Sequence, residues 1–470
     1  MMDDVFSYLE KNFSADLEAV RTFLRQPSIS YTSQGIAETA ELVRSMIADL
    51  GGAAQIIPTP GHPLVYGRLD EGADRTLLYY SMYDVMPADE PGWSVDPFAA
   101  EIVDLPKYGS SIVARGAVNT KGPTAAFFRA LKAYKAVRGK LPVNLIFIVE
   151  GEEEMGSRHF NEFVPTHKHL FAGAEAAIFP FFAQDEGLQT FMWLGTKGLL
   201  YFELTARGGE WGGPRSRGIH GCFAGWVHNP VWRLVQALAT MVGPGDRILV
   251  QGLADGAIDL SKSDRQAMAD CADLYNERDF LDAYDVKRLK WPGQGVAVWE
   301  KLFSQPTLNI DGIWGGYTGP ETKTLVPHQA STKMDVRLVP RMEPDAVVAA
   351  IRKHLDDHGF SDVEMKVLNK YHWSKVSIEE PVVQAMLQTY QQLGRRVQVQ
   401  PLNPGSAPYW IFERVLGIPY ISGGLGHGSR QHSSDEYCTV QGLLDFEKSM
   451  VQFLDNYPRI AAAAGQNASR

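Results

Sequence analysis

The feature that most constrains this chain is an alternation of amphipathic helices and apolar strands that is interrupted once and then resumes. Apolar residues at helical spacing from Asp3 to Arg25 predict a helix, and the apolar run Val143 to Val149 predicts a strand buried on both faces. Near Gly198 the pattern changes to half-exposed strands, and from about Glu380 helix and apolar strand return. We therefore predict an α/β domain, its sheet flanked by helices, interrupted by an inserted α+β domain.

The length supports this division, because 470 residues exceed what one ordinary hydrophobic core accommodates. We place the first part of the α/β domain at 1–198, the insertion at 199–376 and the second part at 377–470. With 45 basic and 55 acidic residues, the net charge of −10 argues against a nucleic-acid partner.

Cysteine usage and the N-terminus bear on the compartment. Cys222, Cys271 and Cys438 lie far apart without a CxxC pair, which fits a reducing environment and excludes a cysteine-rich zinc module. The start MMDDVFSYLEKNF is acidic where a signal peptide is basic, and no apolar run is long enough to span a membrane. We expect a cytoplasmic protein without a membrane partner.

Polar or ionisable residues gather in five segments at predicted strand ends or in Gly-rich loops, where open α/β folds bind ligands. The segments are SMYDVMPADEPGW with Asp84, ARGAVNTKGP with Asn119 and Lys121, EGEEEMGS with Glu152 to Glu154, GIHGCFAGWVHNP with His220, and GGLGHGSRQHSSDEY with His427 and His432.

Three consecutive glutamates after a buried strand are the strongest single signal among these segments. Carboxylates held close together raise one another's pKa, which destabilises a fold unless a cation or a proton-transfer task compensates. Each segment also has a plain structural interpretation. In that interpretation the glutamates cap a helix at Ser157 and Asp84 caps a strand end. Lys121 is then a solvated first-turn residue, and the three histidines are exposed loop or turn residues.

The order and spacing of these segments resemble the dinuclear zinc amide hydrolases that include carnosinase, glutamate carboxypeptidase, aminoacylase and succinyl-diaminopimelate desuccinylase, with the carnosinase-like dipeptidases nearest. The likeness runs from about Leu9 to Leu454. It rests on the five segments and on TLNIDGIWGGYTG and KMDVRLVP, which resemble segments of the family's lid. The resemblance implies a catalytic α/β domain with a mixed sheet, and an inserted lid that serves as the dimerisation domain of a homodimer.

The resemblance also shows that several family metal ligands are replaced. The first histidine ligand falls on Met82, the bridging aspartate on Asn119, and a later aspartate near Pro180. Two ligands, Glu154 and His432, remain. Methionine is a weak donor, proline has none, and an amide oxygen is neutral, so we expect no dinuclear zinc centre. We expect one divalent ion (Zn or Mn) on Glu154, His432 and Asn119, or operation without metal.

Other family positions imply the remaining roles. Glu153 falls where the family keeps its general base, and Asp84 where a carboxylate orients the lost histidine. Arg337 matches a lid arginine that binds the substrate carboxylate, and His220 matches a histidine that crosses the dimer interface to stabilise the oxyanion. Further substrate-binding positions by the same resemblance are Asn309, Thr318, Gly405 and Ser406.

We therefore predict an enzyme that hydrolyses a small amide or related acyl substrate bearing a carboxylate, with Glu153 as base. We expect the oxyanion to be stabilised by His220 of the partner subunit and by either one metal ion or a cationic side chain such as Lys121. Two alternatives stay open: a ligand-binding homologue without catalysis, and a lyase or acyl transferase on the same fold. The pattern leaves undecided whether Asp185, His427, Tyr83 or Ser81 has joined a rebuilt site.

Overall fold

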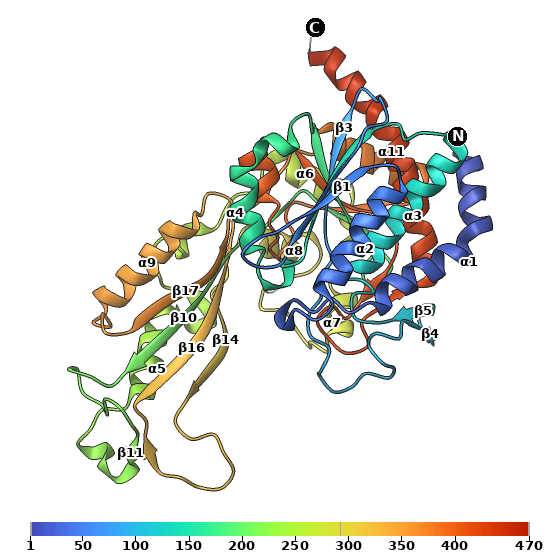
Figure 1. Cartoon of the computed structure of the whole chain (residues 1–470). Coiled ribbons are helices and arrows are strands. Elements are labelled where there is room, and N and C mark those ends of the chain that lie inside the picture. Colours follow the sequence, from blue (N-terminus) through green and yellow to red (C-terminus); the bar gives the residue numbers. More distant parts are fainter. Residues whose placement is uncertain (1, 292, 469–470) are drawn as a thin grey trace.

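The core of the first domain is a six-stranded mixed sheet in the computed structural model, which describes residues 2–291 and 293–468. Strands β3, β6, β7 and β20 run parallel, while β2 runs antiparallel to β6 and to β1 at the edge (Figure 1). In sheet order the strands are β1 (Ala53–Ile57), β2 (Leu64–Leu69), β6 (Asn144–Glu150), β3 (Thr76–Met82), β7 (Ala176–Pro180) and β20 (Tyr420–Gly423).

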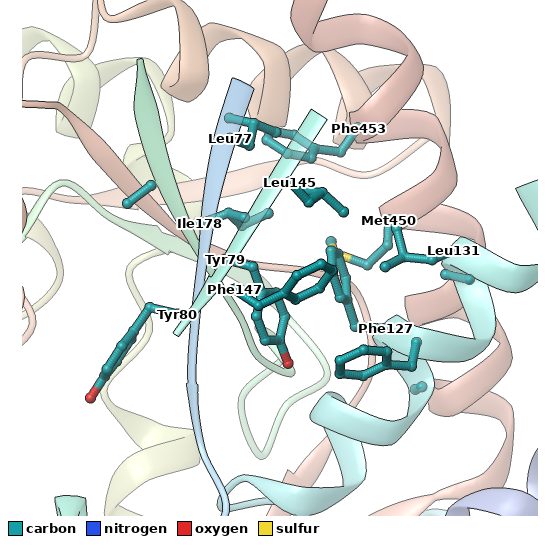
Figure 2. Close-up of a cluster of buried hydrophobic side chains, with 14 of the residues drawn as sticks. Leu77, Tyr79, Tyr80, Phe127, Leu131, Leu145, Phe147, Ile178, Met450 and Phe453 are labelled. Carbon is teal, nitrogen blue, oxygen red and sulfur yellow. The ribbon is translucent and has the colours of Figure 1, made fainter. Parts of the chain in front are cut away.

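Helices cover both faces of this sheet because its central strands carry apolar residues on both sides. Tyr79 and Tyr80 of β3 point to opposite faces (Figure 2). The Tyr79 ring stacks on Phe127 of α3 with 4.7 Å between centroids, and the Tyr80 ring lies 5.2 Å from that of Phe160 on α4. The helices of this domain are α1 (Asp3–Arg25), α2 (Ile36–Asp49), α3 (Lys121–Arg138), α4 (Arg158–Thr166), α10 (Pro381–Gln392) and α11 (Val440–Ala468).

The inserted unit contains a four-stranded antiparallel sheet that projects from the first domain (Figure 1). Its strands, in sheet order, are β14 (Asn309–Gly315), β16 (Gln329–Leu338), β10 (Gly198–Arg207) and β17 (Glu364–Tyr371). Helices α5 (Pro230–Met241) and α9 (Pro344–Asp357) bury one face of this sheet around Phe202, Leu234 and Ile351. Asn229 caps α5, its side chain accepting a hydrogen bond from the Val231 N–H.

One part of the insertion packs on the first domain instead of on the lid sheet, which the sequence pattern did not indicate. It consists of α6 (Lys262–Asp270), α7 (Arg278–Ala283) and α8 (Val296–Ser304). The Gln398 side chain donates to the Leu274 carbonyl at 3.1 Å, and the Tyr275 hydroxyl donates to the Val399 carbonyl. These helices therefore occupy the junction between the lid and the sheet domain.

Short strand pairs connect loops in both domains. They are β4 (Glu101–Leu105), β5 (Gly109–Val113), β21 (Gly428–Ser429) and β22 (Tyr437–Thr439) in one small sheet, and the pairs β8 (Thr190–Trp193) with β19 (Val397–Gln400), β9 (Gly195–Thr196) with β18 (Ser374–Lys375), β11 (Ile219–His220) with β15 (Leu325–Val326), and β12 (Val242–Gly243) with β13 (Arg247–Ile248). Within residues 2–291 and 293–468, no helix has the length and apolar character that a membrane crossing requires.

Candidate active site

The predicted site residues of the first domain lie where the parallel strands of the main sheet end. Strand β3 ends at Met82 and is followed by Asp84, β6 ends at Glu150, and β7 ends at Pro180. Since β3 lies between β6 and β7, these carboxyl ends meet at one edge of the sheet. Met82 and Pro180, which stand where the resemblance puts two metal ligands, are both buried there.

Asp84 holds the turn that follows β6. Its side chain is fully buried, and its two oxygens accept hydrogen bonds from the backbone N–H groups of Glu153 (3.2 Å) and Glu154 (3.1 Å). Burial and the neighbouring Glu154 carboxylate raise the pKa of Asp84 to about 8. Asp84 therefore fixes the backbone that presents both glutamates.

Glu153 sits in a group of carboxylates that includes Glu150 and Asp84. Burial, followed by the charges of Glu154, Glu150 and Asp84, raises the pKa of Glu153 well above its ordinary value. Glu150 is fully buried, and its Oε1 accepts from the hydroxyls of Tyr80 (2.7 Å) and Ser157 (2.9 Å). Its Oε2 has no hydrogen-bond partner in the described part of the chain. This edge of the sheet thus concentrates carboxyl groups in a desolvated place.

The first of the three consecutive glutamates turns away from this group. Glu152 accepts from the His62 N–H at 3.1 Å, and its other oxygen lies 2.6 Å from Nδ1 of His159. Its role is to tie the loop before β2 to the start of α4. The sequence run alone does not distinguish it from Glu153 and Glu154.

Asn119, Glu154 and His432 meet in one cluster, which brings together the three candidate metal ligands. The Asn119 amide nitrogen donates to Glu154 Oε1 at 2.8 Å and lies 3.2 Å from His432 Nε2. His432 Nε2 lies 3.0 Å from Glu154 Oε2, and this contact raises the pKa of the imidazole. The Glu154 side chain is 3% exposed and that of His432 is 52% exposed, so the cluster opens to solvent at the histidine.

A buried ion pair behind this cluster positions Asn119 and the loop that carries His432, and sequence reasoning missed it. Arg115 donates to Glu436 at 2.9 Å, with 2% and 1% of the two side chains exposed. Glu436 also accepts the backbone N–H groups of Val118 (3.1 Å) and Asn119 (3.0 Å), and Arg115 donates to the Ser433 carbonyl at 3.3 Å. Both residues lie inside two of the five selected segments, so the signal was present there.

Lys121 does not reach the carboxylates, contrary to its predicted assistance at the oxyanion. It begins α3, is fully buried, and donates from Nζ to the Gln26 carbonyl, with the Phe23 ring 4.7 Å from the ammonium nitrogen. Burial lowers the pKa of Lys121 to about 7. Its described contacts are structural and join α3 to the end of α1.

The lid contributes a second polar group, centred on Arg337 of β16. Nη1 of Arg337 donates to Ser406 Oγ at 3.0 Å, and Nε donates to Asp335 at 3.1 Å. Asn309 of β14 donates to the same Asp335 at 3.1 Å. The Gly405 N–H donates to Asn403 Oδ1 at 2.8 Å, which shapes the loop that carries Ser406. Four of the predicted substrate-binding residues therefore come together.

His220 and Thr318 lie elsewhere on the lid. His220 is an exposed residue of β11, and its Nδ1 accepts from the Cys222 N–H at 3.1 Å. Figure 1 places β11 at the end of the lid far from the main sheet. Thr318 is exposed in the loop between β14 and β15. Within one chain, His220 is thus remote from Glu153.

The four residues left undecided by the sequence have structural partners. Asp185 accepts two backbone N–H groups of its own turn, and Tyr83 donates to the Pro63 carbonyl at 2.7 Å. Ser81 pairs with Thr124 at 2.6 Å. The buried His427 lies 2.9 Å from the Tyr437 hydroxyl and 3.1 Å from the Gln184 carbonyl. The polar groups of these four residues are therefore used in turns and in contacts between packed segments.

The donor atoms at the candidate metal positions are few. Met82 offers a thioether and Pro180 no side-chain donor, while Asn119 directs its NH₂ group toward Glu154. Across residues 2–291 and 293–468, no group of three or more His, Cys, Asp or Glu side chains is arranged to hold a metal ion.

Comparison with known proteins finds similarity over most of the chain. A family model described as peptidase family M20/M25/M40 matches residues 78–456. The Cys-Gly metallodipeptidase dug1 of Schizosaccharomyces pombe is 28% identical over 382 residues, 75% of each protein. The human Beta-Ala-His dipeptidase is 30% identical over 332 residues, 68% of this chain and 62% of the relative. The structure of an M20 family metallo-carboxypeptidase from Sulfolobus solfataricus has a TM-score of 0.85 and 32% identity, covering 94% of this chain and 99% of that one. The predicted fold class is confirmed by this likeness.

Proposed function

Because the chain belongs to peptidase family M20/M25/M40 and is therefore a hydrolase of amide bonds, we propose that its substrates are dipeptides or similarly small peptides with a free carboxylate. The predictions of this family and of an amide hydrolase are confirmed at that level. The names of the curated relatives, two dipeptidases, support the choice of small peptides.

The observation that carries the proposal is the position of Glu153. It lies on the turn after β6, with its backbone N–H held by Asp84, beside the cluster of Asn119, Glu154 and His432. In the proposed reaction, Glu153 takes a proton from water as the water oxygen adds to the peptide carbonyl. It then returns that proton to the leaving nitrogen as the C–N bond breaks.

Arg337 is the proposed anchor for the substrate carboxylate. Its side chain is one-third exposed, and Ser406 and Asp335 hold the guanidinium in place at 3.0 and 3.1 Å. A guanidinium suits a carboxylate because its fork of N–H donors matches the two oxygens. Asn309, Gly405 and Ser406 support this anchor. Thr318, exposed in the loop between β14 and β15, remains a proposed substrate-binding residue apart from this group.

The family uses divalent metal, and we propose that this chain departs from a two-metal centre. Met82, Asn119 and Pro180 replace three ligands, and these donors do not fit a dinuclear ion pair. Glu154 and His432, with Asn119 beside them, fit at most one divalent ion such as Zn or Mn; operation without metal is the other form of this proposal. The chemistry that such an ion supplies when bound is polarisation of a carbonyl oxygen and acidification of water.

We assign His220 to the neighbouring subunit's oxyanion in a homodimer formed through the lid. The support is its exposure on β11 and its distance, within one chain, from the main sheet (Figure 1). We also propose a cytoplasmic location, because the three cysteines are free thiols.

Two measurements on the purified full chain test the proposal. Release of amine from a set of dipeptides should be detectable for the wild type, lost on Glu153→Gln, and kept on Glu152→Gln, which changes the same side chain one residue away. No turnover of any small peptide by the wild type would overturn it.

Metal content decides the second part. Protein purified without added metal should contain at most one equivalent of divalent ion per chain. Two equivalents, with turnover abolished by chelator, would overturn the proposed departure from a two-metal centre.

A further inference from the structure

A large cavity lies between the lid sheet and the helices at the domain junction, and the proposed function does not use most of it. Its volume is about 1400 Å³, and its walls come from β14, α5, α7 and α8. Arg337 and Asn309 line it, so the proposed carboxylate anchor opens into this space. Small-molecule sites in proteins are typically cavities of about 300–1,000 Å³, so this one is large enough for a bulky ligand group.

The cavity walls are mostly apolar, and several of their side chains are left exposed. Phe280 of α7 is 43% exposed, Trp291 is 41%, Leu302 of α8 is 41% and Ile310 of β14 is 46%. Trp299 of α8 also lines the space, and its indole N–H finds no acceptor among residues 2–291 and 293–468. Exposed aromatic and aliphatic side chains around one hollow are typical of a binding site for an apolar group.

The charge of the lining favours an anion. Among the described residues, five basic side chains and three carboxylates line the cavity, which leaves an excess of two positive charges. Arg337 uses Nε and Nη1 for Asp335 and Ser406, and its Nη2 has no partner in the part of the chain that the structure describes. The Nη2 nitrogen of the guanidinium therefore remains available to a ligand.

We propose that this cavity is a specificity pocket for the C-terminal residue of the peptide substrate, with the carboxylate on Arg337 and a bulky aromatic or branched apolar side chain against Trp291, Trp299 and Leu302. The assignment rests on the proposed function, because it takes the peptide's leaving residue as the ligand. It selects substrates with Phe, Trp or Leu at the C-terminus over those with Gly.

Binding of a simple carboxylate tests the pocket without requiring turnover. Calorimetric titration of the full chain should give at least tenfold tighter binding for 3-phenylpropionate than for acetate, because the phenyl group becomes buried. Trp291→Ala and Leu302→Glu should each weaken phenylpropionate binding about tenfold or more. Trp232→Ala, which removes a tryptophan that is 64% exposed on α5 outside the cavity, should leave it unchanged.

The kinetic arm compares two substrates of one series. The kcat/KM ratio of Ala-Phe to Ala-Gly should be at least ten in the wild type and should fall toward one in Trp291→Ala. Equal binding of phenylpropionate and acetate, or a phenylpropionate affinity unaffected by both cavity variants, would overturn the pocket. Tight phenylpropionate binding by a protein that cleaves no dipeptide would support the pocket and overturn the proposed function alone.

Discussion

Two desolvated groups of charged residues serve opposite ends: the carboxylates Asp84, Glu150 and Glu153 where the strands of the main sheet end (the carboxylate edge), and the ion pair of Arg115 with Glu436. In the carboxylate edge of the main sheet, no Lys or Arg of the described chain forms an ion pair with Asp84, Glu150 or Glu153. In the pair formed by Arg115 and Glu436, the carboxylate has both a guanidinium and two backbone donors.

The difference separates function from stability. Buried carboxylates without a cation destabilise a fold, so three of them gathered where the strands end indicate a task beyond folding. A buried carboxylate whose partners are complete keeps loops in register. We therefore expect changes at the carboxylate edge to alter turnover and changes at the buried pair to alter folding, and the following predictions test that separation.

The largest effect is expected for Glu153→Gln. It should lower kcat about 10²–10⁴-fold, the usual contribution of a general base, while the free energy of unfolding stays the same or rises. Peptide hydrolysis and urea unfolding on the same preparation measure both. A variant that unfolds more easily yet keeps its kcat would reverse the assignment of this edge.

Glu436→Gln should instead destabilise the chain by about 3–5 kcal/mol, because it leaves the buried Arg115 guanidinium with only the partly exposed Glu90 as carboxylate partner. The matched control is Glu90→Gln, which removes the other carboxylate partner of Arg115, 31% exposed, and should cost about 1 kcal/mol or less. Equal losses in urea unfolding would show that burial does not distinguish the two partners.

Ser406→Ala tests the lid side of the site. Loss of the 3.0 Å hydrogen bond to Arg337 should raise KM about tenfold, corresponding to about 1.4 kcal/mol for a bond to a charged group, with kcat nearly unchanged. Steady-state kinetics on one dipeptide give both constants. A fall in kcat at constant KM would mean that Arg337 acts in the transition state instead.

The smallest expected effect is a pH dependence. Burial raises the pKa of Glu150 well above its value in the unfolded chain, so the unfolded state loses its proton first as the pH rises. The wild type should therefore lose stability above the ordinary glutamate pKa, and Glu150→Gln should remove that loss. The stability gained by the variant should be larger at pH 8 than at pH 5.

Glu447 on α11 provides the control for this measurement. Burial also raises its pKa, and it lies outside the site. In urea unfolding, the stability gained by Glu447→Gln should also be larger at pH 8 than at pH 5, while turnover should stay unchanged. If Glu150→Gln gained more stability at pH 5 than at pH 8, the buried Glu150 carboxyl would not be protonated in the folded chain.

Sequence periodicity predicted the central strands well because they are apolar on both faces. The strand expected at Val143 to Val149 is β6, Asn144–Glu150. The pattern predicts a final helix from Leu443 to Tyr457, but α11 runs from Val440 to Ala468 and continues through Pro458. Helices α6, α7 and α8 were missed because they have only six to nine residues, too few for a clear periodic signal.

The direction of individual side chains was beyond the reach of the pattern. Three adjacent glutamates look alike in sequence, yet the Glu152 side chain contacts His159. The Glu154 side chain contacts Asn119 and His432 instead. Lys121 has the spacing of a site residue, but its long chain reaches back to Gln26. Such directions depend on contacts between segments distant in sequence, which spacing does not report.

The exposed His220 at the outer end of the lid means that, in the proposed dimer, one inactive chain can complement another. If each active site combines Glu153 of one chain with His220 of the other, two different inactive chains complement each other. Mixing Glu153→Gln with His220→Ala and allowing subunits to exchange should restore about one quarter of the wild-type sites, since half of the dimers are then mixed and each has one intact site. Neither variant alone should gain activity on the same treatment.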